Sequence, residues 1–284
     1  MLVENHIPQC FKEAVIIPIP KPNGRYRPIS LLVTLSKTLE RMICTRIYET
    51  WLPRDTQFGC RKGHSSIDAV IRLLHQSSMA FSKDEYFAAI FLDFSKAYDR
   101  LSRKKLVLEL YDLNIPPALV LLIDNWLQSR TFKVKHKGVL SGLKFTSNGL
   151  PQGSCLSVAL WLIYIDRIAI SKNDQLFMDD TCITASEKSL RQLNSKLQTK
   201  LNNILSWCQS YSVRINPEKT KLLLNSYCGS FHVTLDDAEI FATKYAKYLG
   251  VDLRSFTDGD LIRVDVSGIC SDVIRKCNLL KILR

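Results

Sequence analysis

The chain has 284 residues, of which 46% are hydrophobic and 23% are charged, and its formal net charge is +12 at pH 7. This balance excludes a disordered chain and suffices for one large domain or two modest ones with a buried core. The excess of lysine and arginine favours a polyanionic partner, nucleic acid first and an anionic membrane surface second, although an ordinary solvated surface is also compatible with it.

The predicted elements begin with a strand and several helices. A strand over residues 14–20 ends at prolines and leads into a basic turn over residues 21–25. Hydrophobic spacing predicts helices over residues 31–49, 65–77, 103–112 and 117–128, with a buried strand over residues 87–94 between the second and the third. Ser65 or Ser66 is the expected N-cap of the second helix, with Asp68 in its first turn.

The second half of the chain mixes hairpins with helices. We expect a hairpin from residues 131–137 and 142–147, an apolar helix over 155–170, a second hairpin over 175–185, an amphipathic helix over 190–211, short strands over 221–225, 230–235 and 247–253, and a last helix over 268–283. This irregular order predicts an α+β fold rather than alternating βαβ units.

The cysteines and the apolar runs bear on the class of protein. The nine cysteines are odd in number and include no Cys-x-x-Cys pair, which argues against a disulfide framework and against a zinc site. Residues 1–9 do not resemble a signal peptide, and the longest apolar run, residues 158–165, is far shorter than the roughly 20 residues of a membrane span. We expect an intracellular protein with no membrane segment, without a preference for nucleus or cytoplasm.

Three carboxylates are the most informative residues of the chain. Asp179 and Asp180 are adjacent at the expected tip of the second hairpin, where a fold normally places Gly or Asn unless a cation binds there. Asp93 ends the buried strand, where an N-cap for the next helix is the alternative. Three carboxylates on two strands suit a pair of divalent ions, and a site with two metals suits phosphoryl transfer.

A turn-rich segment over residues 149–154 enters the apolar helix. Its sequence is Gly-Leu-Pro-Gln-Gly-Ser. Glycine lets the backbone approach a ligand closely, and the N-terminus of a helix favours anions. A plain loop with a serine cap is the alternative.

Seven motifs in chain order resemble the reverse transcriptase domain of a non-LTR (LINE-type) retrotransposon. They are residues 14–21 with 26–30, then 57–66, 92–99, 149–154, 177–180, 215–221 and 248–250. The resemblance covers about residues 10–255. It implies a right-hand polymerase with fingers over about residues 1–86, and a palm over about residues 87–255 whose antiparallel sheet packs on helices. Residues 256–284 would be the start of a truncated thumb or a C-terminal connector.

The resemblance also implies a reaction and its partners. The family's reaction is RNA-directed DNA polymerisation, a nucleotidyl transfer of dNMP to a primer 3′-hydroxyl, with an RNA template, a DNA primer and dNTPs as partners. The oligomeric state is left without a prediction.

The family's catalytic roles carry over to matching positions. Asp93, Asp179 and Asp180 would hold two Mg²⁺ ions, or Mn²⁺ in their place. Lys219 is the candidate proton donor to pyrophosphate, with Lys221 as its competitor, and a solvated lysine is the alternative at either position.

The nucleotide-binding roles fall on five further residues. Lys21 and Arg27 match residues that bind the triphosphate, and Gln152 and Gly153 match the floor of the nucleotide pocket. Tyr98 matches the steric gate against a 2′-hydroxyl, with an aromatic ring packed in the core as the alternative.

Basic residues without one of these assigned roles are candidates for contacts with template and primer phosphates, or are simply solvated: Arg61, Lys62, Arg103, Lys104, Lys105, Lys133, Lys135 and Lys137.

Two other functions stay open. One is a catalytically inactive, truncated fragment that only binds nucleic acid through its basic surface. The other is a related polymerase that takes ribonucleotides, against which the bulky Tyr98 argues.

Overall fold

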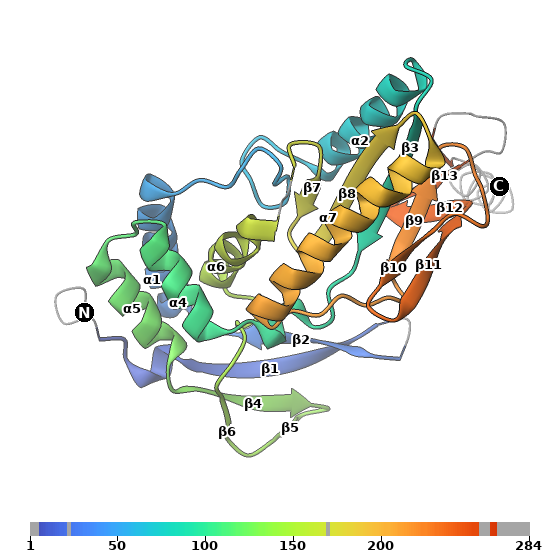
Figure 1. Ribbon diagram of the computed structural model, residues 1–284. Coiled ribbons are helices and arrows are strands. Elements are labelled where there is room, and N and C mark those ends of the chain that lie inside the picture. The colour runs from blue at the N-terminus through green and yellow to red at the C-terminus, as the bar shows by residue number, and fades with distance from the viewer. Residues whose placement is uncertain (1–5, 22–23, 169–170, 256–261, 266–284) are drawn as a thin grey trace, which may run out of the picture. The chain divides into compact units, whose positions relative to one another are not determined.

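A computed structural model describes residues 6–21, 24–168, 171–255 and 262–265 (Figure 1). The predicted helix over residues 268–283 lies outside the described residues, as does most of the segment 256–284. The chain divides into two compact units: residues 1–60, 94–169 and 206–214 form the first, and residues 61–93, 170–205 and 215–284 form the second.

The first unit contains a five-stranded sheet. Its strands are β1 (Glu13–Pro20), β2 (Tyr26–Leu31), β4 (Arg130–His136), β5 (Val139–Leu140) and β6 (Lys144–Thr146). Their order is β2-β1-β4-β5, with β6 also paired to β4. The sequence did not predict β2, which contains Pro28; β2 is an edge strand, where proline is tolerated because no ladder hydrogen bond is lost.

Helices form the rest of the first unit. They are α1 (Thr34–Thr50), α3 (Ala97–Arg100), α4 (Arg103–Asp112), α5 (Pro117–Leu127) and α6 (Cys155–Ile165), with short 3₁₀ helices at Gln9–Phe11 and Asp166–Ile168. Nearly every side chain of α6 is buried, including Trp161, and α6 packs against both α1 and α4. The helix predicted over residues 155–170 therefore exists as a core element but ends earlier, in the second 3₁₀ turn.

The second unit is built on a six-stranded sheet. Its strands are β3 (Tyr86–Leu92), β7 (Gln175–Phe177), β8 (Asp180–Glu187), β9 (Lys221–Leu224), β10 (His232–Leu235) and β11 (Ala238–Thr243). The order is β10-β11-β9-β3-β8-β7. The sheet is antiparallel, as expected, except where β11 runs parallel to β9. The hairpin of β10 and β11 explains this exception, because the chain returns through β10 before β11 joins β9.

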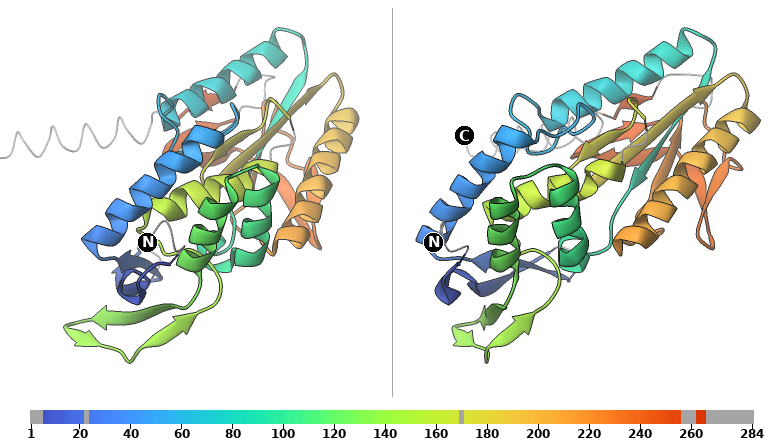
Figure 2. Two further views of the ribbon diagram at one scale, coloured as in Figure 1. Left: turned by 90° about the vertical axis from the view of Figure 1, so that its left-hand side faces the viewer. Right: turned by 60° about the vertical axis from the view of Figure 1, so that its left-hand side comes forward.

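Two helices cover the six-stranded sheet. Figure 2 shows α2 (Ser66–Phe81) on one face and α7 (Leu190–Tyr211) on the other. The C-terminal part of α7, residues 206–211, is grouped with the first unit. All residues of β3 after Tyr86 are buried, as expected for a central strand covered on both faces.

The start of α2 was predicted correctly. The Ser65 hydroxyl accepts a hydrogen bond from the Asp68 amide, and the Asp68 carboxylate accepts one from the Ser65 amide. This capping box satisfies two amides that the helix itself leaves without partners.

A small sheet completes the second unit. It consists of β12 (Tyr245–Tyr248), β13 (Val251–Arg254) and β14 (Arg263–Val264) in that order. The single strand predicted over residues 247–253 was wrong: Leu249 and Gly250 both have positive φ and form a tight turn between two strands.

Candidate active site

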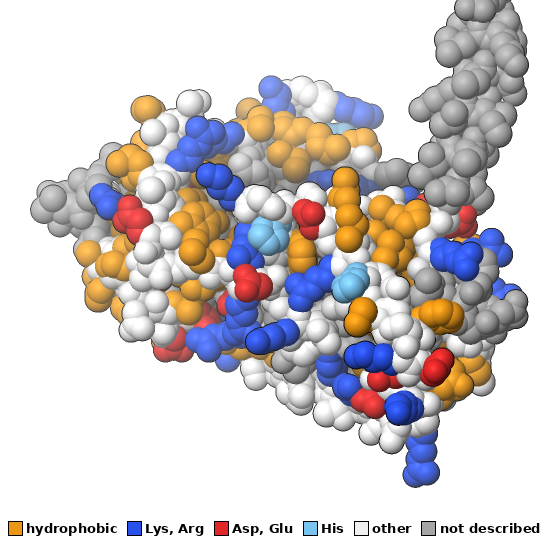
Figure 3. All heavy atoms as spheres, turned by 90° about the horizontal axis from the view of Figure 1, so that it is seen from above, with side chains coloured by type: hydrophobic (Ala, Val, Ile, Leu, Met, Phe, Trp, Pro, Cys, Tyr) orange, Lys and Arg blue, Asp and Glu red, His pale blue; other side chains and the backbone are white. Residues whose placement is uncertain are grey.

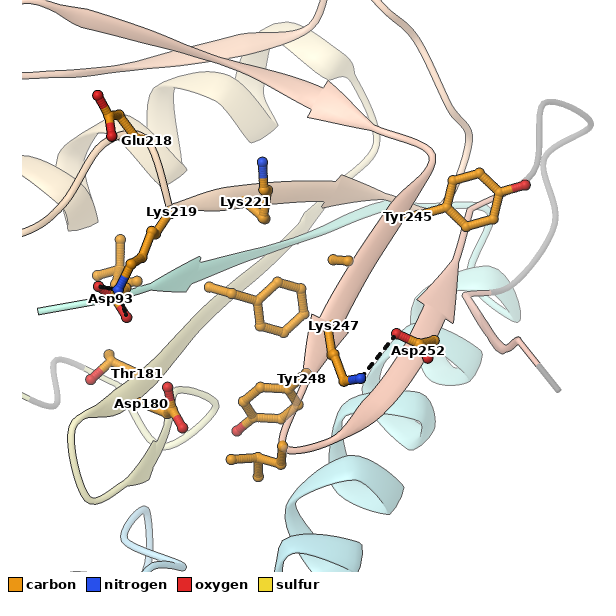
Figure 4. Close-up of a pocket in the computed structure, with 14 residues that line it drawn as sticks. Asp93, Asp180, Thr181, Glu218, Lys219, Lys221, Tyr245, Lys247, Tyr248 and Asp252 are labelled. Atoms are coloured by element: carbon orange, nitrogen blue, oxygen red, sulfur yellow. Dashed lines mark hydrogen bonds and ion pairs between the residues drawn. The ribbon is translucent and has the colours of Figure 1, made fainter. Parts of the chain in front are cut away.

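The register of the six-stranded sheet brings two of the predicted carboxylates together. Leu92 of β3 pairs with Thr181 of β8, so the next positions, Asp93 and Asp180, face each other across the ladder. The backbone carbonyl of Asp93 accepts a hydrogen bond of 2.8 Å from the Asn216 amide, which holds the end of β3 in place. Asp93 and Asp180 line one cavity (Figure 4).

The third carboxylate lies in the turn between β7 and β8. Phe177 pairs with Asp180, which leaves Met178 and Asp179 as the two turn residues. Met178 has a φ of 61°, in the left-handed region that favours glycine. The hairpin therefore keeps a large side chain at its tip despite a backbone conformation that costs free energy.

The electrostatics of the three carboxylates favour a cation. The pKa of Asp180 is raised to about 6, first by partial removal of solvent and then by the negative charges of Asp179 and Asp93, while Lys219 opposes the shift. The carboxylate is not fully enclosed, since Asp180 retains an exposed surface. A divalent cation at this position would relieve the repulsion among the carboxylates.

Lys219 acts as the cationic partner of Asp93. Its Nζ lies 3.0 and 3.2 Å from the two carboxylate oxygens of Asp93. Lys219 follows Asn216 in a short turn, where the Lys219 amide donates to the Asn216 carbonyl. The turn that holds the backbone of Asp93 therefore also supplies the ammonium group beside its side chain.

Among the residues that the structure describes, no three His, Cys, Asp or Glu side chains are close enough to hold a metal ion by themselves. The donor set nevertheless suits Mg²⁺, a hard cation that one or two carboxylates often bind together with water and substrate phosphates. Asp93 and Asp180 supply such oxygen donors, and Asp179 adds a third in the adjacent turn.

The cavity beside Asp93 and Asp180 has a volume of about 460 Å³ and is lined by several lysine side chains. Lys219, Lys221 and Lys247 line it together with two tyrosines of β12, Tyr245 and Tyr248. Lys247 also lies 4.0 Å from Asp252 of β13. The sequence did not single out Tyr245 or Lys247. In the structure both are exposed, and they alternate along β12 with the buried Ala246 and Tyr248.

Tyr248 is the buried aromatic of this cavity. Its ring contacts Phe91 of β3 at a centroid distance of 4.9 Å, and its hydroxyl has no hydrogen-bond partner among the described residues. Burial raises the pKa of Tyr248 well above its ordinary value, and the nearby Cys182 and Asp180 contribute. The hydroxyl therefore stays neutral at physiological pH.

The predicted nucleotide-binding residues lie in the first unit. Lys21 follows β1 and its amide donates to the Arg25 carbonyl at 2.7 Å, closing the basic turn. Arg27 lies in β2 opposite Ile19. Both basic side chains are exposed, as a phosphate contact requires.

Backbone contacts hold the other three predicted nucleotide-binding residues in place. The Leu150 amide donates to the Tyr98 carbonyl at 2.8 Å, and the Ser30 amide of β2 donates to the Gln152 carbonyl at 2.6 Å. Gly153 has a φ of 118°, and a Cβ atom there would lie 2.7 Å from the Ser30 carbonyl oxygen. The segment 149–154 is thus held between α3 and β2.

The ring of Tyr98 packs against the core and still reaches solvent. Its ring stacks on the buried Trp161 of α6 at a centroid distance of 5.3 Å, so it is anchored by the core. The side chain is only half-buried, and part of its surface remains open to solvent.

The N-terminus of α6 does not offer a free anion site. Ser154 caps the helix by accepting a hydrogen bond from the Ser157 amide, and its hydroxyl donates to the Glu40 carboxylate at 2.8 Å. Glu40 is fully buried, and its side chain occupies this helix end.

The expectation that Arg103 contacts nucleic-acid phosphates was wrong. Its side chain is buried and donates hydrogen bonds to backbone carbonyls. The remaining basic candidates are mostly on the surface, with Lys133, Lys135 and Lys137 exposed on or beside β4. Figure 3 shows Lys and Arg side chains spread between hydrophobic and acidic ones on the face that it draws.

None of the described helices is both long enough and apolar enough to span a membrane.

Comparisons with known proteins agree on one family. Residues 19–253 match the family model described as reverse transcriptase (RNA-dependent DNA polymerase). The RNA-directed DNA polymerase from mobile element jockey of Drosophila melanogaster is 31% identical over 270 residues, which are 87% of this chain and 29% of that protein. The probable RNA-directed DNA polymerase from transposon BS of the same organism is 29% identical, over 87% of this chain and 30% of that protein. The chain therefore spans less than a third of the curated relatives it matches.

The fold resembles that of telomerase. Apo telomerase from Candida tropicalis, truncated from its C-terminal domain, matches with a TM-score of 0.60 at 16% identity, over 91% of this chain and 56% of that chain. Telomerase from Candida albicans, in complex with a fragment of telomeric RNA, matches with a TM-score of 0.60 at 15% identity, over 94% of this chain and 48% of that chain. At such low identity, these matches establish the fold alone.

Proposed function

The chain belongs to the reverse transcriptase family, and from this premise we propose that it is an RNA-directed DNA polymerase of a retrotransposon. The reaction would transfer a dNMP unit from a dNTP to the 3′-hydroxyl of a primer and release pyrophosphate. One observation carries the proposal: Asp93 and Asp180 face each other across β3 and β8 and border a cavity lined by lysines.

Asp93, Asp179 and Asp180 are the residues we assign to metal binding, and Mg²⁺ is the ion, with Mn²⁺ as a substitute. Two such ions, when bound, would supply the positive charge that activates the primer hydroxyl and offsets charge on the leaving pyrophosphate. The raised pKa of Asp180 supports this assignment, because the carboxylates repel one another without a cation between them.

Lys219 is the residue we assign to proton transfer toward pyrophosphate. Its Nζ borders the cavity and is bonded to Asp93, so it must leave that carboxylate when a cation binds there. Lys221 lines the same cavity and is the competing candidate.

Nucleotide binding is assigned to Lys21, Arg27, Tyr98, Gln152 and Gly153. Arginine suits the triphosphate because its planar guanidinium binds phosphate oxygens through two parallel hydrogen bonds. The backbone bond from Leu150 to Tyr98 and the side-chain bond from Gln152 to Asp99 support a common pocket for the sugar and base.

An RNA template and a DNA primer are the proposed macromolecular partners. The net charge of +12 supports this, since lysine and arginine side chains release counterions from the phosphate backbone. The division into fingers over about residues 1–86 and palm over about residues 87–255 stays a prediction.

Primer extension tests the proposal. The wild-type chain, Asp179→Asn and the matched surface variant Asp112→Asn would be compared on an RNA template with a DNA primer, Mg²⁺ and dNTPs. We expect Asp179→Asn to lose extension by about a hundredfold or more, because one metal ligand is neutralised, while Asp112→Asn keeps it. Undiminished extension by Asp179→Asn would remove the metal-site assignment.

The same assay separates the two alternatives. Binding of nucleic acid that weakens with salt, with no extension on any template, would identify a silent binding fragment. Incorporation of ribonucleotides as fast as deoxyribonucleotides by the wild-type chain would identify the other polymerase class. Tyr98→Ala should then leave that ratio unchanged, whereas a steric gate predicts that the variant gains ribonucleotide incorporation.

A further inference from the structure

Arg103, the first residue of α4, binds four backbone carbonyl groups. Its Nε donates to Gly149 at 3.0 Å, its Nη1 donates to Leu127 at 2.7 Å and to Thr146 at 2.9 Å, and its Nη2 donates to Asn148 at 3.2 Å. Only 9% of the residue is exposed, and it forms no ion pair among the described residues. All three nitrogen atoms of the guanidinium are therefore engaged with the backbone.

Three of these carbonyls belong to the segment that leads into the predicted pocket floor. Residues 146, 148 and 149 immediately precede the segment of Leu150 and Gln152. The same segment is tied from its other side, because the Gly149 amide donates to the Leu101 carbonyl at 3.0 Å and the Leu150 amide donates to the Tyr98 carbonyl at 2.8 Å. Arg103 thus fastens the segment to the stretch that carries Tyr98.

The backbone of Gly149 packs closely against that of Tyr98 and Asp99. Gly149 has a φ of 73°, and a Cβ atom there would lie 2.6 Å from the Tyr98 carbonyl oxygen and 2.7 Å from that of Asp99. Asp99 in turn accepts a hydrogen bond of 3.4 Å from the Gln152 side chain. A shift of the Gly149 carbonyl would therefore move both Tyr98 and Gln152.

Only arginine fits this position. Its guanidinium presents five N–H groups in one plane, whereas the lysine ammonium has three N–H groups around a single atom. With lysine, at least one of the four carbonyl groups would lose its hydrogen-bond donor. A buried carbonyl without a donor destabilises the fold by its full desolvation free energy. Burial lowers the pKa of Arg103 to about 10, so the side chain stays charged at neutral pH.

We propose that Arg103 is a positioning residue for nucleotide selection, because it sets the spacing between Tyr98 and Gln152 by holding residues 146–149 against α4. This proposal rests on the nucleotide-binding role proposed above for Tyr98 and Gln152. Arg103 itself touches no substrate, and its effect passes through the backbone of Gly149 and Leu150.

The kinetic test uses the full chain with Arg103→Ala and Arg103→Lys, and Arg41→Ala as the matched control. Arg41 is an exposed arginine of α1 in the same unit. We expect the KM for dNTP to rise about tenfold or more in both Arg103 variants, and discrimination against ribonucleotides to fall by a similar factor, because small displacements at a binding site are costly. The Kd for primer–template should remain that of the control. A fall in kcat with unchanged KM and unchanged discrimination would overturn the proposal.

Hydrogen exchange provides a test that does not need catalysis. The Gly149 and Leu150 amides should exchange at least about tenfold faster in Arg103→Lys than in Arg41→Ala, while the amides of α7 keep their rates. If the wild-type chain extends no primer, the proposed function fails, and this measurement still decides the positioning role. Unchanged exchange at both amides would refute it. If Arg103→Ala fails to fold, Arg103→Lys carries both tests.

Discussion

The ammonium group of Lys219 lies on the carboxylate of Asp93, with Nζ 3.0 Å from one oxygen and 3.2 Å from the other. A cation that binds Asp93 must therefore compete with a cation that the chain supplies itself. Both side chains keep access to solvent, 49% for Lys219 and 34% for Asp93, so water weakens the pair.

Removing this competitor should strengthen Mg²⁺ binding. Lys219→Gln is expected to change the free energy of unfolding without Mg²⁺ by less than about 1 kcal/mol, because exposed ion pairs contribute little. Thermal unfolding of Lys219→Gln should reach half of its Mg²⁺-induced stabilisation at a lower MgCl₂ concentration than the wild-type chain. Lys83→Gln, an exposed lysine in the same unit, is the control. Identical MgCl₂ midpoints for the wild-type chain and Lys219→Gln would contradict the competition.

The raised pKa of Asp180 predicts a pH dependence of stability in the absence of metal. Its folded-state pKa is about 6, above the ordinary value of 3.8. Between these values the folded protein holds a proton that the unfolded chain has released, so Asp180 stabilises the fold least once the pH exceeds about 6.

Asp180→Asn removes this titration. The free energy of unfolding would be measured with urea at several pH values in EDTA. The value for Asp180→Asn minus that for the wild-type chain should increase as the pH rises from about 4 to about 6, and should stay constant at higher pH. Asp112→Asn is the control for substitution of an exposed aspartate. A pH-independent difference between Asp180→Asn and the wild-type chain would show that Asp180 keeps its ordinary pKa.

At the turn position of Met178, glycine should give a more stable protein than alanine. A left-handed conformation costs most L-residues about 1–2 kcal/mol, and glycine avoids this cost. Met178→Gly is therefore expected to exceed Met178→Ala in free energy of unfolding by about 1 kcal/mol, since both variants lose the side chain and only one relieves the backbone. Urea unfolding checks this comparison, and a more stable alanine variant would exclude strain at the turn.

A buried ion pair supports the base of the same hairpin. Lys200 of α7 donates to Asp174 at 2.7 Å, and the side chain of Asp174 is 1% exposed. Asp174 also accepts hydrogen bonds from the Thr184 and Ser171 amides. Lys200→Met should lower the free energy of unfolding by about 3–5 kcal/mol, because it leaves a buried carboxylate without its cation.

Adding Asp174→Asn to Lys200→Met should recover part of that loss, since an amide costs less to bury than a carboxylate. A double variant as unstable as the sum of the two single variants would show that the two residues act independently.

Local patterns in the sequence predicted the longer helices and the family. The bounds predicted for α4 and α7 are those observed, because hydrophobic spacing and caps act within a few residues of one another. The capping box of Ser65 and Asp68 is such a case. The motif series identified the reverse transcriptase family, which the match over residues 19–253 confirms.

The tertiary structure decided which segments form strands and which groups a side chain such as Arg103 contacts. β2 and β11 were missed, since a strand is stabilised by neighbours that lie far away in the chain. Arg103 shows the same limit for a single side chain: its sequence context suggested a surface cation, and only the fold revealed the carbonyl groups around it.

In the candidate site, the sequence identified the acids, and the fold decided how they are arranged. The sequence by itself identified Asp93, Asp179 and Asp180 as acids at the ends of two strands, because an acid at a strand end is visible in the residue order. That Asp93 and Asp180 face each other, with Lys219 paired to Asp93, depends on the register of β3 with β8 and on the turn after Asn216. Register and turn position are set by packing between distant segments, and that information appears only when the chain is folded.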